Sequence, residues 1–382
     1  MGYGYIVNNN GIVSIYNSIN GRLIKRDIQM NAKGRAECIA ENIGEDFSVT
    51  LRNNQPIIIV RSQKGEIIML SEGESRVIQK NITGNSEVYV NLIMNDRAVR
   101  LIYLNGYSLI TKGINKEGNE ARVLDTLRNI PYRLIEAVEG GYILLYKRIN
   151  SQRELGYREI TANGVGEFKE IFSTGFDIGD FSACCDGENL HFVFVSASRF
   201  AVRVMYVRRG KSGFTGPKNL WEGSRCGTAC IAAEGDKVYV WWESGGNLFQ
   251  SVSHNSGESF RQCVRGEKLE KYKKVLYLEK NSFGITELML SENEDIYGPD
   301  EVKDLIFKNS FKLNEHKSNE ADLINRLKEE LNKKQEEIER LSNTLLSKNQ
   351  EASKMEYTLR QKCKELATRL EQMQTPDNTK NE

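Results

Sequence analysis

The arrangement of apolar residues divides this 382-residue chain into two parts with different periods. Over the first three hundred residues, apolar side chains gather in short, strand-length runs separated by turn-forming Gly, Asn and Asp. Beyond residue 320, an apolar side chain recurs at every seventh position. The first pattern is typical of β-strands, and the second is typical of a coiled-coil helix.

Five of the short runs are the strongest strand candidates because they are apolar on both faces. They begin 43, 43, 48 and 48 residues apart, and they are Pro56–Val60, Val99–Tyr103, Tyr142–Tyr146, Leu190–Val195 and Val238–Trp242. Strands that are covered on both sides have such continuous apolar runs. A spacing of roughly 45 residues is that of one β-propeller blade.

Turn-forming residues repeat with the same period. A shorter strand precedes several of the five runs and ends in a tight turn, as at Asp186-Gly187, and a glycine turn such as Gly245-Gly246 follows the run. Each repeat is therefore a strand, a tight turn, a strand, a glycine hairpin and a further strand. Two packed sheets of a β-sandwich are the alternative, but equal spacing over five units favours a propeller.

The two ends of the β-rich part are expected to complete the fold together. We predict one composite blade made of the strands Tyr5–Val7, Ile12–Tyr16, Val275–Leu278 and Gly284–Leu290. Pairing of this kind would cover strand edges that otherwise promote aggregation. The predicted fold is an all-β propeller of about six blades, with seven as the alternative, followed by a long C-terminal helix.

Composition shifts along the chain predict four segments. Residues 1–310 form the propeller, the polar residues 311–320 form a linker, residues 321–374 form the coiled-coil helix, and residues 375–382 form a disordered tail. The polar stretch before residue 320 has no apolar period, which is typical of a connecting segment.

The predicted coiled-coil interface is one apolar stripe. Its a positions are Ile324, Leu331, Ile338, Leu345, Ala352, Leu359, Leu366 and Met373, and its apolar d positions are Leu327, Leu341 and Met355. Lys334, Lys348 and Lys362 occupy d positions between them. Lysine in a coiled-coil core lowers stability and acts on partner choice and register. We expect this helix to pair with a second copy or with another coiled-coil protein.

Charge and hydropathy narrow the class of protein. Fifty-three basic residues balance 52 acidic ones, so the chain has no overall field that would recruit nucleic acid. The N-terminus lacks the basic and apolar segments of a signal peptide, and the apolar runs are too short to span a membrane. We therefore expect a cytoplasmic location.

Cysteine and histidine offer little material for a metal site. The seven cysteines have no matching pairs of metal-ligand spacing, and there are only three histidines. We expect free thiols and neither metal nor cofactor. Cys38, Cys184 and Cys230 lie at comparable places ahead of apolar strands, which suggests small core residues.

One turn resembles a known motif. Ser253-His-Asn-Ser-Gly-Glu-Ser-Phe260 is similar to the Asp-box, S-x-D-x-G-x-[ST]-[WF], of sialidase-like (BNR-repeat) propellers. Ser253, Gly257, Ser259 and Phe260 match, and Asn255 replaces the aspartate. The resemblance implies a structural turn between the outer strands of a blade, outside any active site.

The resemblance also raises the question of catalysis. Sialidases are expected to use an arginine triad, a Tyr–Glu nucleophile pair and an aspartate, and Tyr132-Arg133-Leu134-Ile135 is similar to their Arg-Ile-Pro signature without its proline. We interpret Arg133 as an arginine at a blade edge. No catalytic residue is assigned from the sequence.

These observations predict a non-enzymatic interaction or scaffold protein. The propeller would provide a recognition face for a ligand that no motif identifies, and the coiled coil would provide association. The alternative is a sialidase-like glycan-binding protein or a divergent glycoside hydrolase. That alternative predicts a cluster of arginine and carboxylate side chains at the propeller mouth.

Overall fold

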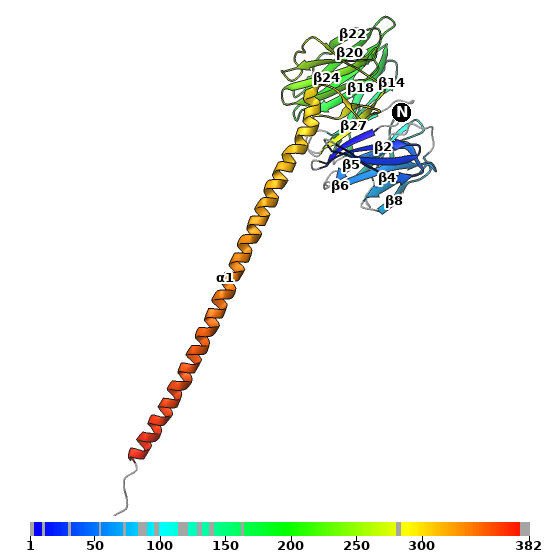
Figure 1. The fold of residues 1–382 in the computed structure, drawn as a ribbon. Helices are drawn as coiled ribbons and strands as arrows, with labels where there is room; N and C mark the ends of the chain where they lie inside the picture. The colour runs from blue at the N-terminus through cyan, green and yellow to red at the C-terminus, as the bar shows by residue number, and fades with distance from the viewer. Residues whose placement is uncertain are drawn as a thin grey trace, which may run out of the picture. The chain divides into compact units, whose positions relative to one another are not determined.

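The computed structural model describes residues 4–9, 12–29, 32–52, 55–71, 74–82, 90–94, 99–113, 121–127, 132–136, 141–161, 164–279 and 284–374. The chain forms two compact units, Met1–Leu313 and Asn314–Glu382 (Figure 1). The first contains all the strands and the start of the one long helix, and the second contains the rest of that helix.

Five sheets follow one another along the chain, and each is made of antiparallel neighbours in sequence. Blade 1 contains β5 (Ile43–Arg52), β6 (Gln55–Ser62), β7 (Ile67–Ser71) and β8 (Glu74–Gln79). Blade 2 contains β9 (Val90–Met94), β10 (Val99–Asn105), β11 (Ser108–Gly113) and β12 (Ala121–Thr126). Blade 3 contains β13 (Tyr132–Glu136), β14 (Tyr142–Ile149), β15 (Arg153–Thr161), β16 (Gly164–Val165) and β17 (Lys169–Thr174).

The next two blades have the same design. Blade 4 contains β18 (Asp177–Cys185), β19 (Leu190–Ala197), β20 (Val202–Gly210), β21 (Gly213–Phe214) and β22 (Lys218–Gly223). Blade 5 contains β23 (Ala229–Glu234), β24 (Lys237–Ser244), β25 (Asn247–Ser253) and β26 (Val264–Lys268). The five anchoring runs predicted from the sequence are β6, β10, β14, β19 and β24, the second strand of each blade.

Blade 6 combines the two ends of the β-rich part, as the sequence predicted. Its strands are β1 (Gly4–Asn9), β2 (Ile12–Ile19), β3 (Arg22–Gln29), β4 (Ala32–Glu41), β27 (Tyr272–Glu279), β28 (Glu287–Ser291) and β29 (Ile296–Tyr297). The seam is a parallel pair, in which Tyr5 of β1 lies opposite Leu276 of β27. The Asn8 side chain also donates a 3.0 Å hydrogen bond to Glu279 across the seam.

The apolar cores lie between blades. Blade 1 contacts blade 2 and blade 6, β18 of blade 4 contacts β13 and β23, and β23 contacts β28 of blade 6. One buried cluster joins blades 1, 2 and 3, where the Tyr132 hydroxyl also donates to the Ile102 carbonyl at 3.0 Å. Successive meander sheets whose cores lie between neighbours are the blades of a β-propeller. This packing explains why both faces of β24 are buried.

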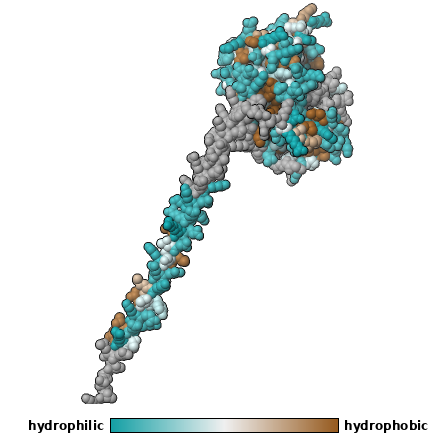
Figure 2. Space-filling view, viewed as in Figure 1, coloured by the Kyte–Doolittle hydropathy of each residue, from teal (hydrophilic) through white to brown (hydrophobic). Residues whose placement is uncertain are grey.

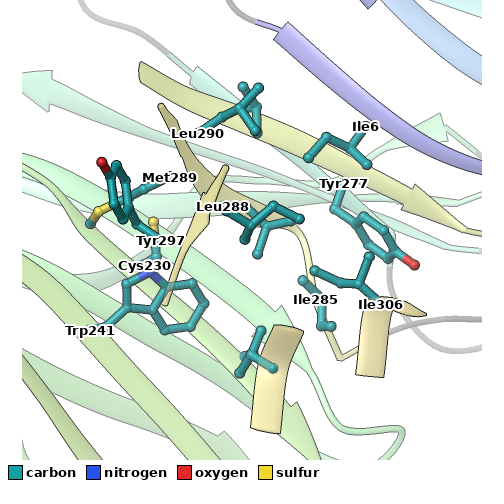
Figure 3. Close-up of a cluster of buried hydrophobic side chains, with 14 of the residues drawn as sticks. Ile6, Cys230, Trp241, Tyr277, Ile285, Leu288, Met289, Leu290, Tyr297 and Ile306 are labelled. Atoms are coloured by element: carbon teal, nitrogen blue, oxygen red, sulfur yellow. The ribbon is translucent and has the colours of Figure 1, made fainter. Parts of the chain in front are cut away.

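The cluster at the blade 5–blade 6 junction receives the start of the helix (Figure 3). Trp241 and Cys230 of blade 5 and Ile6 and Leu288 of blade 6 are fully buried in it. α1 (Asp300–Gln374) adds Val302 and Ile306, one turn apart and both fully buried, to the same cluster.

The helix therefore begins earlier than the sequence predicted. The expected linker, residues 311–320, lies inside α1, whose first turn has Pro299 accepting from the amides of Val302 and Lys303. A polar stretch without Pro or Gly can continue a helix, so the missing apolar period did not mark a break. The predicted tail, residues 375–382, lies outside the described residues. No described helical segment is long and apolar enough to cross a bilayer.

Four charged side chains meet where the inner strands of blades 3, 4 and 6 approach one another. Arg133 of β13 forms ion pairs with Glu287 of β28 and, at 3.4 Å, with Asp180 of β18. The Lys274 ammonium of β27 lies 2.8 Å from Asp180 and 3.0 Å from Glu287. It also donates to the Ala229 carbonyl of blade 5 at 2.9 Å. Two positive and two negative charges thus compensate one another inside the propeller.

Electrostatic coupling outweighs burial in this cluster. Burial alone would raise the pKa of Asp180, but the charges of Lys274 and Arg133 hold that pKa below its ordinary value. Burial alone would lower the pKa of Lys274, but Asp180 and Glu287 raise that pKa above its ordinary value. Asp180 and Lys274 therefore remain charged at neutral pH, and removing one side chain of the cluster leaves an uncompensated buried charge.

The substitution Lys274→Met is expected to lower the free energy of unfolding by about 3–5 kcal/mol, because two buried carboxylates would keep only Arg133. Arg203→Met is the matched control, since Arg203 and Glu222 form an ion pair 2.7 Å apart in which both side chains are about half exposed. The control substitution should lower the free energy of unfolding by less than about 1 kcal/mol. Urea unfolding of both variants measures the difference, and equal losses would contradict a stabilising role for the buried cluster.

The contribution of Asp180 should depend on pH in a defined direction. Its native pKa lies below the unfolded value of about 3.9, so its ionised form stabilises the native state above that pH. The difference in unfolding free energy between the wild type and Asp180→Asn should be constant near neutrality. It should shrink below about pH 4, where Asp180 becomes protonated in the unfolded state, until the pH falls below its lower native pKa.

Urea unfolding at a series of pH values measures that difference. Asp177→Asn serves as the control, because the Asp177 side chain is 71% exposed in its ion pair with Arg153. Its difference from the wild type should stay small at every pH. A wild-type advantage over Asp180→Asn that persists unchanged to about pH 2 would show that the cluster does not depend on the Asp180 charge.

Candidate interaction surfaces

A row of uncovered apolar side chains follows one face of α1. Its described a and d positions are all exposed, and they are Leu331, Ile338, Leu341, Leu345, Ala352, Met355, Leu359 and Leu366. Figure 2 shows apolar side chains spaced along the helix among polar ones. The side chains of Ile324, Leu327 and Met373 lie outside the described residues. This stripe, Leu331–Leu366, is called the α1 stripe below.

Charged residues flank the α1 stripe on the same helix. Lys334, at a d position, forms an ion pair with Glu337 at 3.4 Å, and its side chain is 78% exposed. Arg360 pairs with Glu356 at 2.9 Å. Both pairs lie within the helix at i,i+3 or i,i+4 spacing, so they support the helix itself and leave the apolar positions open.

The Asp-box-like residues form one hydrogen-bonded turn after β25. The Ser253 hydroxyl accepts from the Gly257 amide at 2.9 Å, and the Asn255 side-chain oxygen accepts from the Ser259 amide at 2.9 Å. Ser256 and Gly257 both have positive φ, 50° and 80°. Only glycine fits at Gly257, where an added Cβ would lie 1.8 Å from the Tyr206 hydroxyl. Asn255 thus supplies the acceptor oxygen that an aspartate would supply.

The turn is attached to the neighbouring blade. Phe260 packs edge-on against Tyr206 of β20, with ring centroids 4.7 Å apart, and Lys218 donates to the Gly257 carbonyl at 2.8 Å. These contacts join blade 5 to blade 4. Each residue of the motif takes part in a backbone or packing interaction, which is the arrangement of a structural turn.

A buried His–Asp–Tyr network, which the sequence analysis did not identify, supports the same junction. His191 of β19 is fully buried, with Nδ1 2.7 Å from the Tyr206 hydroxyl and Nε2 2.9 Å from Asp186. Burial raises the pKa of Tyr206. For Asp186, hydrogen bonds from His191 and Asn189 outweigh burial and hold the carboxyl pKa well below its usual range. The only sequence signal was a histidine inside an apolar strand.

Arg133 lies on β13, the edge strand of blade 3, as the sequence suggested, but this edge is buried between blades. Its side chain is 4% exposed, and both of its carboxylate partners belong to the protein itself. A cluster of arginine and carboxylates does exist, but it lies inside the propeller and is electrically balanced. A sugar carboxylate would have to displace Glu287 to reach this guanidinium. The signal that could have revealed the cluster was a charged residue within or at the start of the apolar run of each of four strands, β13, β18, β27 and β28.

All seven cysteines are free thiols. Cys184 and Cys230 are buried as expected, but Cys38 is exposed. The reason is its position on β4, the outermost strand of blade 6, which has no neighbouring strand on its far side. Within the part of the chain that the structure describes, no group of His, Cys, Asp and Glu is arranged to hold a metal ion.

Comparisons with known proteins give similarities of fold only. No family model and no curated protein sequence matches this chain. Among solved structures, the six-bladed β-propeller lectin of Aleuria aurantia is 10% identical, with 70% of this chain and 94% of the lectin covered and a TM-score of 0.41.

Two further structures are propeller domains. The Cps50 (Swd1) β-propeller domain of Myceliophteria thermophila is 11% identical over 78% of this chain and 98% of that domain, with a TM-score of 0.46. The β-propeller domain of the trilobed protease from Pyrococcus furiosus is 10% identical over 77% of this chain and 94% of that domain, with a TM-score of 0.43. At these values the functions of the three proteins are not carried over to this chain.

Proposed function

We propose that this protein is a non-enzymatic interaction protein in which α1 pairs with a second copy through the α1 stripe and holds two propellers together. The observation that supports the proposal is the exposure of every described a position of the stripe. Burying one Leu or Ile side chain contributes about 1.5–3 kcal/mol. A stripe of this length on a single helix therefore favours association with another apolar helix face.

The flanking charges favour a parallel pair. In that arrangement each g position faces the following e position of the partner, and only Glu351 and Glu356 bring two carboxylates together. An antiparallel pair would set g positions against g positions. Four of those are glutamates: Glu330, Glu337, Glu351 and Glu365.

Such a pair would act through multivalency. When one of two joined propellers has bound a ligand that carries several copies of the recognised group, the second propeller is held close to the next copy. The effective concentration of that second binding event is therefore high, and weak contacts at each face combine into stable binding. The buried, self-compensated Arg133 cluster supports recognition over catalysis, because its arginine is already occupied.

The substitution Leu345→Lys is expected to dissociate the pair, because it places a charge at a buried a position. Leu346→Lys is the matched control: it changes the adjacent leucine, which is 62% exposed against 66% for Leu345, on a different face of the helix. Sedimentation velocity of the full chain should show a dimer for the wild type and the control. It should show a monomer for Leu345→Lys.

Two results would contradict the proposal. One is a wild-type chain that is monomeric at micromolar concentration. That result would indicate that the α1 stripe binds a helix of a different protein. The other is equal dissociation by both substitutions, which would show that the heptad face is not the interface. Circular dichroism of each variant verifies that α1 remains helical.

Replacing a core lysine should strengthen the pair. Lys348→Leu fills a d position with an apolar side chain and removes a charge from the interface, so the midpoint of thermal dissociation should rise. Lys354→Leu, which lies at a c position outside the seam, should leave the midpoint unchanged. Thermal denaturation followed at two protein concentrations measures both effects. A lower midpoint of thermal dissociation for Lys348→Leu would exclude this heptad register.

A further inference from the structure

A second group of uncovered apolar side chains lies on the propeller, away from the α1 stripe. Phe200 is 95% exposed in the turn between β19 and β20, where its chain neighbours are Arg199 and Ala201. The Ser198 hydroxyl accepts from the amides of Phe200 and Ala201 and donates to the Ala201 carbonyl at 2.9 Å. A well-formed turn therefore presents an aromatic ring that touches little of its own chain.

The turn of Phe200 adjoins the start of blade 4. Ala197 pairs with Val202 across the base of the turn, and Ala197 also pairs with Asp177, the first residue of β18. Phe176 immediately precedes Asp177 and is 53% exposed. Phe176 and Phe200 therefore lie at the same end of blade 4.

Blade 3 presents a third apolar side chain at this end. Ile149, the last residue of β14, is 59% exposed and pairs with Arg153 across its turn. Arg153 pairs with Thr174 of β17, and its Nε lies 3.4 Å from the Asp177 carboxylate. The tips of blades 3 and 4 thus form one continuous edge.

Equivalent turns in two other blades repeat the feature. The turn between the second and third strands carries exposed Tyr107 in blade 2, and Ile19 ends β2 before the corresponding turn of blade 6. In blades 2, 3 and 4 the strands alternate in direction, so these turns lie at the end where the first strand begins. In blade 6, β1 runs parallel to β27, and the β2–β3 turn lies at the end where both of those strands begin. Four of the six blades place a large apolar side chain there.

Arginines and carboxylates both lie near the tips of blades 3 to 5, and two of the arginines have no ion-pair partner among the described residues. Asp177 pairs with Arg153, and Glu222 pairs with Arg203 at 2.7 Å, so both carboxylates have partners. Arg199 beside Phe200 and Arg225 before β23 are exposed, and no described carboxylate forms an ion pair with either of them. We name Ile149, Phe176, Phe200, Arg199 and Arg225 the tip surface.

We propose that the tip surface binds the surface of a lipid bilayer that contains anionic headgroups. Separate, protruding apolar tips have no shared walls that would form a pocket, but a fluid interface can take up each tip independently. Exposed phenylalanine rings enter the boundary between headgroups and acyl chains, and arginines near them bind anionic headgroups. With a net charge of +1, the chain has little long-range attraction, so binding depends on these contacts.

The test is flotation of the full chain with vesicles of phosphatidylcholine that contain about one-third phosphatidylserine. The double substitution Phe176→Ser and Phe200→Ser should lower the bound fraction about tenfold or more, because two rings no longer enter the interface. The control is Val123→Ser with Val264→Ser. These two valines are 58% and 59% exposed, but they lie on the outer strands β12 and β26.

Charge is tested separately. Arg199→Glu with Arg225→Glu should reduce binding to the anionic vesicles, and added salt should weaken wild-type binding. Vesicles of phosphatidylcholine alone should bind the wild type less than the anionic vesicles do. Thermal denaturation of each variant verifies that the propeller remains folded.

The proposal fails if the wild type does not float with anionic vesicles at low salt. An acidic protein would then be the remaining candidate to bind the tip surface. It also fails if the valine control loses as much binding as the phenylalanine variant. The test is independent of helix pairing. A monomeric Leu345→Lys chain should bind more weakly through lost avidity, yet still depend on Phe176 and Phe200.

Discussion

The propeller depends on the exact neutrality of the charges buried at its centre. Arg133, Asp180, Lys274 and Glu287 come from three blades, and none of them has enough contact with solvent to be stabilised without its partners. Separating one blade from the others would leave ions in a low-dielectric interior, at a cost of several kcal/mol. The same cluster removes the arginine from any role in binding an external carboxylate, so a stabilising interaction also limits what the propeller can do.

Closure of the propeller rests on a second long-range interaction, the parallel pairing of β1 with β27. β28 then places Glu287 in the central cluster and Leu288 in the apolar cluster that also receives Val302 and Ile306. The strands that close the propeller, the buried charges and the first turns of α1 are thus mutually dependent. A fold of this kind gains stability only when most of it is assembled, because its contacts join residues far apart in the chain.

The uncovered apolar residues are of two physical kinds. On α1 they recur every seven residues along one helix face, which is complementary to another helix. On the propeller they occupy the tips of separate turns with arginines beside them, which suits a soft and negatively charged surface. Joining two propellers through α1 would multiply weak contacts at the tips, so the two proposals describe one protein that pairs and then adheres to a surface.

The sequence by itself determined the local elements. Continuous apolar runs of strand length and a stripe of period seven are features of short segments, so the second strand of blades 1 to 5 and the helix from 321 to 374 were predictable from residue order. The pairing of the two ends was predictable only because strands remained at both ends once the repeats had been assigned. Asn255 and Gly257 likewise indicated their turn, because the chemistry of a turn is local. The tertiary structure decided which side chains far apart in the chain meet. Arg133 lies on an edge strand as expected, but that strand is buried and Arg133 belongs to an ion cluster. Cys38 was expected in the core and is exposed on an outermost strand. The start of α1 was misplaced for the same reason: Val302 and Ile306 are helical because they pack against strands whose sequence positions gave no sign of that contact.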